Sequence, residues 1–211
     1  ILCIHITKNE DYLFLGNSVG NIAIYQIIPD KENSDFNFVL FQKIFNQKKS
    51  ISDIDINLDL NILATSSING NINLFTWPLC KLFRVIKTPK YDCFKCSKIF
   101  LSESSLPSVI IILEKKDEKE ILSYSINGEF LMNIKESKNI SNVVKIKNLN
   151  SYEYLTYFVY DELKIINLPS LSTHLIINIF NYDCKFIAVN NDLSTIFGIS
   201  EDGTQIQTIK S

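Results

Sequence analysis

Apolar and polar residues alternate with a period of two along most of the chain, which is typical of strands with one buried face. The pattern is most complete between Ile51 and Trp77, where the apolar positions fall into three short groups. Asn69-Gly70 separates the second and third groups, and glycine adopts a positive φ angle at little cost in a tight turn. The stretch therefore predicts three strands and two turns: strands at 51–56, 62–65 and 72–75, and turns at 57–61 and 67–70.

The same arrangement occurs earlier in the chain. The segment Leu13–Tyr25 (LFLGNSVGNIAIY) aligns without a gap with Leu63–Phe75 (LATSSINGNINLF), so that Gly20 lies at the position of Gly70. Two copies about fifty residues apart indicate an internal repeat, which is typical of solenoid and propeller folds.

Each repeat also predicts a fourth strand. In the first repeat, the third strand is predicted at 21–25, a charged loop at 29–36 (PDKENSDF) and the fourth strand at 39–45. Four strands per repeat form the blade of a β-propeller, so the sequence predicts an all-β fold of about four blades and part of a fifth, as a portion of a larger ring. No segment predicts a long helix. The predicted blades cover residues 1–48, 49–92, 93–138, 139–180 and 181–211.

Composition narrows the compartment and the class of partner. The 211 residues are 46% hydrophobic and carry a net charge of −2, so no basic excess favours nucleic acid or an anionic membrane surface as a direct partner. Five cysteines, an odd number, favour reduced thiols over a disulfide framework. The start of the chain has no signal-peptide pattern, and it begins with Ile1 rather than Met, so we expect a piece of a longer protein.

The repeat resembles those of the WD-repeat family. The likeness lies in the apolar second strand, the small-residue turn and the apolar third strand, as in LATSSINGNINLFTW (63–77) and IFGISEDGTQIQTI (196–209). No repeat has the Gly-His pair of that family. Its Trp-Asp dipeptide is replaced by Tyr25-Gln26, Phe75-Thr76 and Ile166-Asn167. The resemblance therefore implies a WD-like propeller whose blades are held by packing, without the family's polar network of histidine and aspartate.

Within that family the chain is similar to the C-terminal propeller of BEACH-domain proteins. The order of the motifs carries this resemblance: 51–77, LFRVIK (82–87), SLPSV (105–109), ILSYSINGEFL (121–131) and DELKIINLPSL (161–171). It implies a non-enzymatic protein-interaction platform in a scaffold of vesicle and membrane trafficking, cytoplasmic or peripheral on internal membranes. The implied partners are proteins, including a neighbouring BEACH module in the same chain, with no nucleic acid and only indirect contact with membrane.

Residues able to catalyse a reaction are few and scattered. Neither His5 nor His174 lies beside a serine and an acid in a recognisable nucleophile motif. The glycine-rich loops that bind phosphates are also missing from the sequence. We therefore predict no catalytic and no cofactor-binding residues.

Two further patterns fall short of a metal site. Cys93-Phe94-Lys95-Cys96 is a C-x-x-C motif, but structural zinc requires a second pair of ligands, and a redox motif opens a helix whereas this one precedes a predicted strand. The acidic turns at 161–162 and 201–202 each supply two carboxylates, and calcium takes six or more oxygen ligands. We predict no metal-binding residues.

The alternative function is a propeller enzyme or a small-ligand-binding propeller, with its site in the central channel or in blades outside this sequence. The acids best placed for a channel are Asp53 and Asp55, on the predicted first strand of the second blade. They alternate with Ile54 and Ile56, so we expect the two carboxylates to share one solvated face.

Partner binding is predicted at aromatic residues close to loops, because aromatic residues are enriched at interface hot spots. The candidates are Trp77, Tyr91, Phe94 and Tyr152. For Trp77 the alternative is packing between blades. The mixed-charge segments 29–36 and 114–120 are predicted to be solvated loop tips, with a specificity loop for a partner as the other reading.

Overall fold

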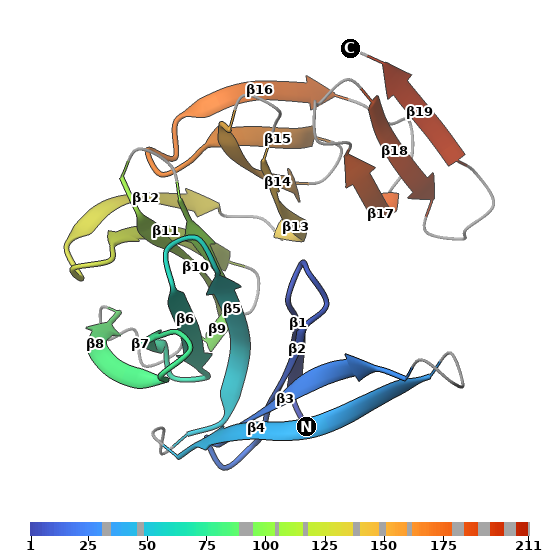
Figure 1. The fold of residues 1–211 in the computed structure, drawn as a ribbon. Coiled ribbons are helices and arrows are strands. Elements are labelled where there is room, and N and C mark those ends of the chain that lie inside the picture. Colours follow the sequence, from blue (N-terminus) through green and yellow to red (C-terminus); the bar gives the residue numbers. More distant parts are fainter. Residues whose placement is uncertain are drawn as a thin grey trace. The chain divides into compact units, whose positions relative to one another are not determined.

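A computed structural model of the protein describes residues 1–30, 35–45, 49–88, 95–103, 106–115, 118–136, 140–147, 151–159, 162–178, 184–189, 195–200 and 206–210. These residues form β-strands and turns; no helix occurs among them, and so none there is long and apolar enough to cross a membrane. The described strands make four four-stranded antiparallel sheets and one three-stranded sheet (Figure 1). This confirms the predicted all-β fold of propeller blades.

The first two sheets are meanders in which the strands follow one another in chain order. Gly20 and Gly70 occupy the tight turns between the second and third strands at φ angles of 90° and 82°, as the turn pattern predicts. Sheet 1 contains β1 (Cys3–Ile6), β2 (Tyr12–Gly16), β3 (Ile22–Pro29) and β4 (Phe36–Ile44). Sheet 2 contains β5 (Ile51–Asn57), β6 (Ile62–Ser67), β7 (Asn71–Thr76) and β8 (Lys81–Lys87).

The remaining sheets follow the same order of pairing. Sheet 3 contains β9 (Lys95–Ser102), β10 (Ser108–Lys115), β11 (Glu118–Ser125) and β12 (Phe130–Glu136). Sheet 4 contains β13 (Ile140–Lys147), β14 (Glu153–Val159), β15 (Glu162–Asn167) and β16 (Thr173–Asn178). Sheet 5 contains β17 (Cys184–Val189), β18 (Thr195–Ser200) and β19 (Ile206–Lys210).

The chain divides into two compact units, each described here by itself. Sheets 1 and 2 lie within unit 1, sheets 4 and 5 lie within unit 2, and the strands of sheet 3 contribute residues to both. Unit 1 comprises Ile1–Leu101, Ile111–Glu114 and Ile126–Gly128. Unit 2 comprises Ser102–Ile110, Lys115–Ser125 and Glu129–Ser211.

Sheets 1 and 2 share one register over their first three strands. Ile4 pairs with Leu15 in sheet 1, as Ile54 pairs with Thr65 in sheet 2. In both sheets the register between the third and fourth strands shifts at the equivalent residue. The gapless repeat in the sequence is therefore a repeat of strand pairing, and equivalent residues project from the same side of their sheets.

Sheet 1 packs on sheet 2 through an apolar core within unit 1. The core residues are aliphatic and aromatic and come from both sheets, and burying each of these large side chains contributes roughly 1.5–3 kcal/mol. They are Phe14, Ile22, Ile24 and Ile44 from sheet 1, and Ile51, Ile54, Leu63, Phe75, Trp77 and Cys80 from the strands of sheet 2 and the turn between β7 and β8. Leu13–Tyr25 and Leu63–Phe75 thus form the framework of this core.

In unit 2 the strand β14 is buried along its whole length. Its sequence EYLTYFV is a nearly continuous apolar run, which is typical of a strand covered on both faces. The hydroxyl of Tyr157 donates to the Glu136 carboxylate at 3.1 Å, and Lys164 Nζ donates to the same carboxylate at 2.7 Å. Burial, with the Glu136 charge beside it, raises the pKa of the Tyr157 hydroxyl, so this side chain acts as a neutral donor.

β3 and β4 are longer than the sequence predicts. β3 continues beyond the predicted end at residue 25 to Pro29, and β4 begins at Phe36 rather than at residue 39. The predicted charged loop at 29–36 therefore contains two strand ends, while residues 31–34 lie outside the described part. Isoleucine and phenylalanine have high β-propensity, so the apolar residues on either side of the charged ones stay paired.

Candidate functional site

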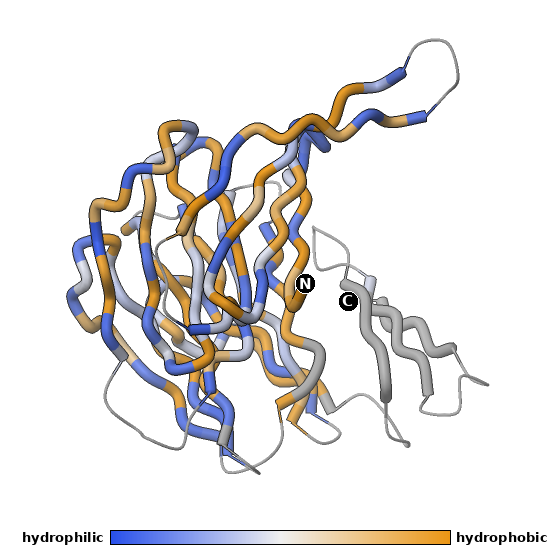
Figure 2. Tube along the Cα trace, turned by 90° about the horizontal axis from the view of Figure 1, so that it is seen from below, coloured by the Kyte–Doolittle hydropathy of each residue, from blue (hydrophilic) through white to orange (hydrophobic). Residues whose placement is uncertain are grey.

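Sheet 1 carries a two-stranded extension of β3 and β4. The pairing of β2 with β3 ends at Gln26, whereas β3 and β4 remain paired as far as Pro29 and Phe36. We call the paired segments 27–29 and 36–38 the ribbon. Figure 2 shows the ribbon projecting from the rest of sheet 1. A two-stranded ribbon is only marginally stable in water, so this one gains stability if its apolar side chains are covered.

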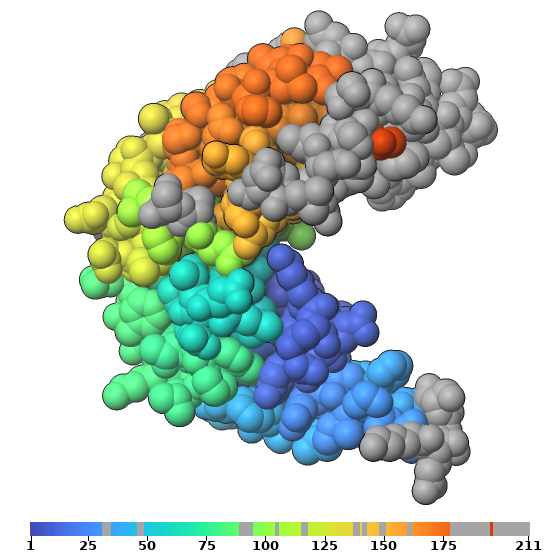
Figure 3. All heavy atoms as spheres, turned by 45° about the horizontal axis from the view of Figure 1, so that its top comes forward, coloured from blue at the N-terminus to red at the C-terminus, as the bar shows by residue number. Residues whose placement is uncertain are grey.

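The ribbon and the rest of β4 present large apolar side chains to solvent. Phe36 and Phe38 expose 56% and 55% of their surfaces, and Val39, Leu40 and Phe41 are also exposed. β4 is the last strand of its sheet, and a sheet edge offers backbone groups to an incoming strand. In Figure 3 the light-blue atoms of the ribbon and β4 extend away from the darker blue atoms of β1 and β2. An exposed apolar patch of this kind is typical of a protein-interaction site.

The charged run between the two strands of the ribbon predicts a loop at 29–36, and for this reason the sequence does not predict the ribbon. The signal was present: Phe36, Phe38 and Leu40 alternate, and Ile27-Ile28 precedes the charges. Alternation at residues 36–40 indicates a strand that starts three residues earlier than predicted.

Trp77 is a core residue, which corrects its prediction as an exposed anchor. Only 9% of its surface is accessible. Its ring lies edge-on to Tyr12 with centroids 4.8 Å apart, and it also contacts Phe14 at 5.4 Å and Phe41 at 5.8 Å. It therefore packs between sheets 1 and 2, as in the alternative weighed for it. The physical reason is that a ring directly after β7 faces the aromatic residues of the preceding sheet.

The other predicted anchors are Tyr91, Phe94 and Tyr152. Tyr91 and Phe94 lie outside the described residues. Tyr152, directly before β14 in unit 2, exposes 65% of its surface. In the same unit the His174 ring packs against Tyr154 with centroids 4.9 Å apart, which places this histidine in a packing role.

Asp53 and Asp55 share one face of β5, but that face is not solvated as the sequence predicts. The Ile99 N–H donates to Asp53 Oδ2 at 2.9 Å, and the Leu101 N–H donates to Asp55 Oδ2 at 2.6 Å. Burial raises the pKa of Asp53, although the Ile99 N–H and the Lys98 charge oppose this shift. The two carboxylates therefore bond the first strand of sheet 2 to the backbone of β9.

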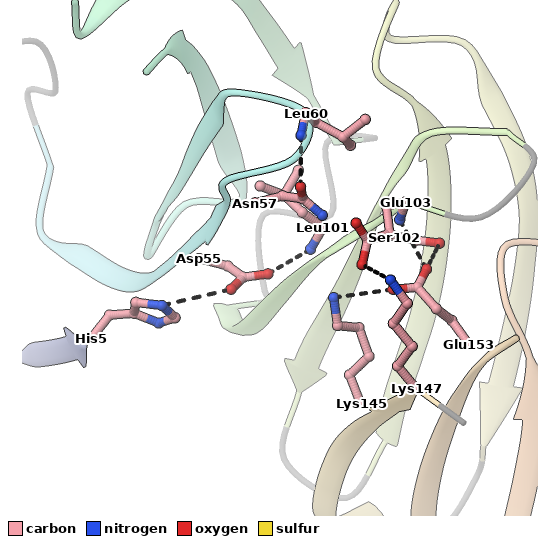
Figure 4. Close-up of polar contacts among 10 residues, drawn as sticks. All are labelled: His5, Asp55, Asn57, Leu60, Leu101, Ser102, Glu103, Lys145, Lys147 and Glu153. Atoms are coloured by element: carbon pink, nitrogen blue, oxygen red, sulfur yellow. Dashed lines mark hydrogen bonds and ion pairs between the residues drawn. The ribbon is translucent and has the colours of Figure 1, made fainter. Parts of the chain in front are cut away.

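His5 faces the same carboxylate pair from sheet 1. Its Nε2 lies 3.9 Å from Asp55 Oδ1 (Figure 4). Its ring lies edge-on to Phe14, with centroids 6.2 Å apart. Asp55 is thus shared between a backbone donor and an imidazole. This arrangement links the first strands of sheets 1 and 2.

Unit 2 contains a second, separate group of charged residues centred on Glu153. Its Oε2 accepts from Ser102 Oγ at 2.5 Å and from the Glu103 N–H at 2.9 Å, while Lys145 Nζ lies 3.4 Å from its Oε1. Lys147 Nζ in turn donates to Glu103 at 2.5 Å (Figure 4). Because Glu153 is buried, these donors compensate a charge that is costly to bury alone.

The mixed-charge segment 114–120 is only in part the solvated tip that the sequence predicts. Residues 116–117 lie outside the described part, but Glu120 is buried on β11. Its carboxylate accepts from Asn133 Nδ2 at 2.6 Å and lies 3.9 Å from Lys135 Nζ. Lys119 Nζ donates to the Ile140 carbonyl at 2.5 Å. The charges at this end of the segment pair with neighbouring strands because β11 extends into it.

Cys80 and Cys96 are buried, Cys3 is partly buried, and the thiols of all three are neutral. Cys96 is 3% exposed, and burial raises its pKa to about 12. Cys3 and Cys80 have pKa values raised to about 11 by the same cause. Cys93 and the acidic turns at 161 and 201–202 lie outside the described residues. Among the residues that are described, no three His, Cys, Asp or Glu side chains are grouped to hold a metal ion.

Comparisons with known proteins identify the fold alone. No family model matches the sequence, and no curated protein matches it. Two solved structures of Hsv2, a β-propeller from the yeast Kluyveromyces lactis, each match with a TM-score of 0.66 at 13% identity. One has its complete loop 6CD, and the other has this loop replaced by a Gly-Ser linker.

The chain matches only part of the length of each Hsv2 structure. All of the chain is covered in both comparisons, and it spans 62% of the length of the linker variant and 59% of the length of the other. Solved chains that match number 1100, so this architecture is too common to select a function. By fold, the chain is similar to β-propellers.

Proposed function

We propose that this protein is a non-enzymatic protein-interaction platform whose docking site is the ribbon together with β4. The observation that carries the proposal is the pair Phe36 and Phe38, each more than half exposed on strands that extend beyond their sheet. Aromatic side chains on such a projecting edge supply large apolar area at low cost in side-chain entropy.

The expected mode of binding is strand addition at the edge of β4. A strand from the partner pairs with the free edge of sheet 1, and its apolar side chains cover Phe36, Phe38 and Leu40, which alternate along β4. Backbone hydrogen bonds then supply affinity, and the phenylalanine positions supply specificity. Coverage also stabilises a ribbon that has only two strands.

The carboxylates of β5 and β14 support a structural role for these acids. Asp53 and Asp55 accept backbone N–H groups, and Glu153 is bonded by Ser102 and Lys145. Carboxylates bonded in this way join neighbouring strands in the folded protein. This favours a binding platform over a propeller enzyme.

The finer assignment rests on the sequence resemblance. We propose a WD-repeat-like propeller at the C-terminus of a BEACH-type scaffold in vesicle trafficking, cytoplasmic or peripheral on internal membranes. The shared register of sheets 1 and 2 supports a repeat of this kind. The partners on this proposal are proteins, including the BEACH module, with membrane contact only through them.

The docking site is tested by changing the ribbon while leaving its sheet intact. Proteins captured from lysate by the wild-type chain are compared with those captured by F36S/F38S. The matched control is F130S/M132S, which alters two comparably exposed residues on β12. We expect specific proteins to be lost with the ribbon variant and kept with the control. Equal capture by both variants contradicts the proposed site.

The identity of the partner is tested separately with purified components. A recombinant BEACH module is titrated with the wild-type chain and with F36S/F38S in a calorimeter. Binding that the ribbon variant weakens by at least about tenfold, which is 1.4 kcal/mol, supports the scaffold assignment. A lack of binding contradicts the BEACH assignment but leaves the lysate result as evidence for a different protein partner.

A further inference from the structure

The last strand of sheet 2, β8, is a basic edge on a slightly acidic protein. It follows β7 in the order of the sheet, and a sheet edge offers backbone N–H and C=O groups to an incoming strand. Its sequence KLFRVIK contains three cations and no acid, whereas the whole chain has a net charge of −2. The cations are Lys81, Arg84 and Lys87, and all three are exposed.

Neighbouring acids do not neutralise these cations. Among the residues that the structure describes, no salt bridge joins Lys81, Arg84 or Lys87 to a carboxylate. The last strand of sheet 3, β12, differs in this respect, because its Lys135 lies 3.9 Å from the carboxylate of Glu120. The positive charge along β8 is therefore available to a further acidic group.

The pairing of β8 with β7 sets the direction of the cationic side chains. Val85 and Lys87 lie two residues apart in a regular part of the ladder, so they project to one side of sheet 2. Arg84 projects to the other side, where its Cδ is 3.6 Å from the place that a Cβ atom on Gly128 would take. A strand added to this edge would therefore meet one cation on each of its two sides.

Large apolar side chains lie among the cations. Leu82, Phe83 and Val85 expose 37%, 43% and 43% of their surfaces. Cations at a sheet edge commonly protect it against pairing with other chains. Protection alone does not account for three exposed apolar side chains beside the cations, whereas a partner that covers them does.

We propose that β8 is a docking edge for an extended acidic peptide segment of another protein, which adds to sheet 2 as a fifth, antiparallel strand. Its sequence pattern follows from the side chains that it meets over the regular part of the ladder. One acid lies opposite Lys87, an apolar residue opposite Val85 and a second acid opposite Arg84. Along an antiparallel partner this pattern is acid, any residue, apolar residue, acid. Neither the ribbon nor β4 contributes a residue to this edge, so it is a second docking site beyond the proposed one.

Charge and strand pairing make different contributions to such a complex. Charge-assisted hydrogen bonds from Arg84 and Lys87 select carboxylates over the corresponding amides. Backbone hydrogen bonds along the edge select an extended peptide over an anionic surface, since lipid headgroups cannot continue a strand ladder. The same cations repel the β8 strand of a second copy of the chain, which disfavours self-association through this edge.

The direct test measures the binding of a short fluorescein-labelled peptide that contains Glu-Thr-Val-Glu, by fluorescence polarisation. Gln-Thr-Val-Gln removes its charges. N-methylation of both Thr and Val removes one ladder donor in either register, because the N–H groups of adjacent residues in a strand point to opposite edges. We expect each altered peptide to bind the wild-type chain at least about tenfold more weakly than the parent peptide does. Equal binding of either altered peptide, or no binding of the parent peptide up to about 1 mM, overturns the proposal.

Variants of the chain locate the site. R84E/K87E reverses two cations of β8, and K8E/K49E makes the same change in net charge at two exposed lysines outside β8. We expect the first to weaken binding of the parent peptide by at least about tenfold and the second by less than about twofold. Equal losses would mean binding by net charge alone and overturn the proposal. The peptide series uses the wild-type chain, so it decides even if a variant fails to fold.

Two further measurements separate this edge from a membrane contact and from the ribbon. In sedimentation with vesicles of phosphatidylserine and phosphatidylcholine, we expect the chain to stay in the supernatant. Vesicle binding that R84E/K87E abolishes, together with no peptide binding, would assign the edge to lipid and overturn the proposal. F36S/F38S, which alters the ribbon, is expected to bind the parent peptide as the wild type does. Loss of peptide binding in F36S/F38S but not in R84E/K87E would place the peptide on the ribbon and also overturn the proposal.

Discussion

Sheets 1 and 2 have the same register, but equivalent residues on their first strands lie against different neighbours. In sheet 2 Ile54 is buried against sheet 1, while in sheet 1 the equivalent Ile4 is exposed. The comparison shows that the local pattern sets the pairing of strands, whereas the neighbouring sheet sets the burial. A repeated sequence therefore gives the same burial only where a neighbouring sheet packs on both copies.

β1 and β5 also differ in the contacts made by the opposite side of each strand, where Cys3 and His5 lie in β1 and Asp53 and Asp55 lie in β5. Asp53 and Asp55 of β5 accept N–H groups from β9. The equivalent positions in β1 are Cys3 and His5, and His5 faces Asp55. Sheet 1 thus joins sheet 2 by apolar packing and an imidazole, while sheet 2 uses carboxylates and backbone donors toward β9.

The largest difference between the sheets is expected for Ile54→Ala against Ile4→Ala. Truncating buried Ile54 leaves a cavity in the core and is expected to lower the free energy of unfolding by about 2–5 kcal/mol. Truncating exposed Ile4 is expected to change it by less than about 0.5 kcal/mol. Urea unfolding followed by the fluorescence of Trp77, the single tryptophan, measures both, because that ring lies in the core between the two sheets.

Equal losses for the two variants would contradict the difference in burial. They would mean that Ile4 is covered in the 211-residue chain. A small loss for Ile54→Ala alone would instead show that sheet 1 does not pack on sheet 2 in solution.

The next largest effect on stability is expected at Gly16, whose equivalent in sheet 2 is Ser66. A Cβ atom on residue 16 would collide with Cys3 Sγ and lie 2.7 Å from Ile51 Cγ2. We expect Gly16→Ala to destabilise the protein by about 1–3 kcal/mol. Ser66→Ala, which removes the hydroxyl 2.8 Å from Ser52 Oγ, is the control, with a loss of about 1 kcal/mol. A Gly16→Ala melting temperature at or above that of wild type would contradict the close packing.

A third, smaller effect on stability is expected at two turns: the β6–β7 turn of sheet 2 and the β11–β12 turn of sheet 3. Gly70 and Gly128 both have positive φ angles, but a Cβ on Gly70 would collide with Thr88 Oγ1, whereas one on Gly128 would lie 3.6 Å from Arg84 Cδ. A side chain in this conformation costs about 1–2 kcal/mol. We therefore expect Gly70→Val to lower the melting temperature more than Gly128→Ala. Identical melting temperatures would contradict the difference in space at the two turns.

The fold was largely predictable because it depends on local patterns. Alternation placed the strands, and Gly20 and Gly70 marked turns whose φ angles are positive in the structure. The gapless repeat predicted one register for two sheets. These signals suffice because period-two patterning and turn chemistry determine which strands pair.

The candidate site was less predictable because exposure depends on residues distant in sequence. Trp77 was predicted as an exposed anchor, and its burial results from Tyr12 and Phe14 of another sheet. Asp53 has the pattern of a solvated acid, and its partner is the Ile99 backbone, which no pattern in the sequence links to it. The ribbon was hidden by the charges between its strands. Neighbours in space, rather than neighbours in sequence, set each of these roles.

The smallest effect is expected for Asp53→Asn, and it appears as a change in pH dependence. Because burial raises the pKa of Asp53, the folded protein binds a proton there more tightly than the unfolded chain does. This contribution to stability is present in acid and is lost as the pH rises from below 3.8 through the raised pKa.

Asparagine retains an oxygen that accepts the Ile99 N–H but cannot ionise, so Asp53→Asn removes this dependence. The free energy of unfolding of wild type minus that of the variant should therefore fall as the pH rises from 3 toward neutrality. Ser66→Ala, close to Asp53 and unable to titrate, should give a constant difference over the same range. A wild-type advantage that grows with pH would mean that the β9 donors outweigh burial, and that the carboxylates stabilise sheet 2 through their charge.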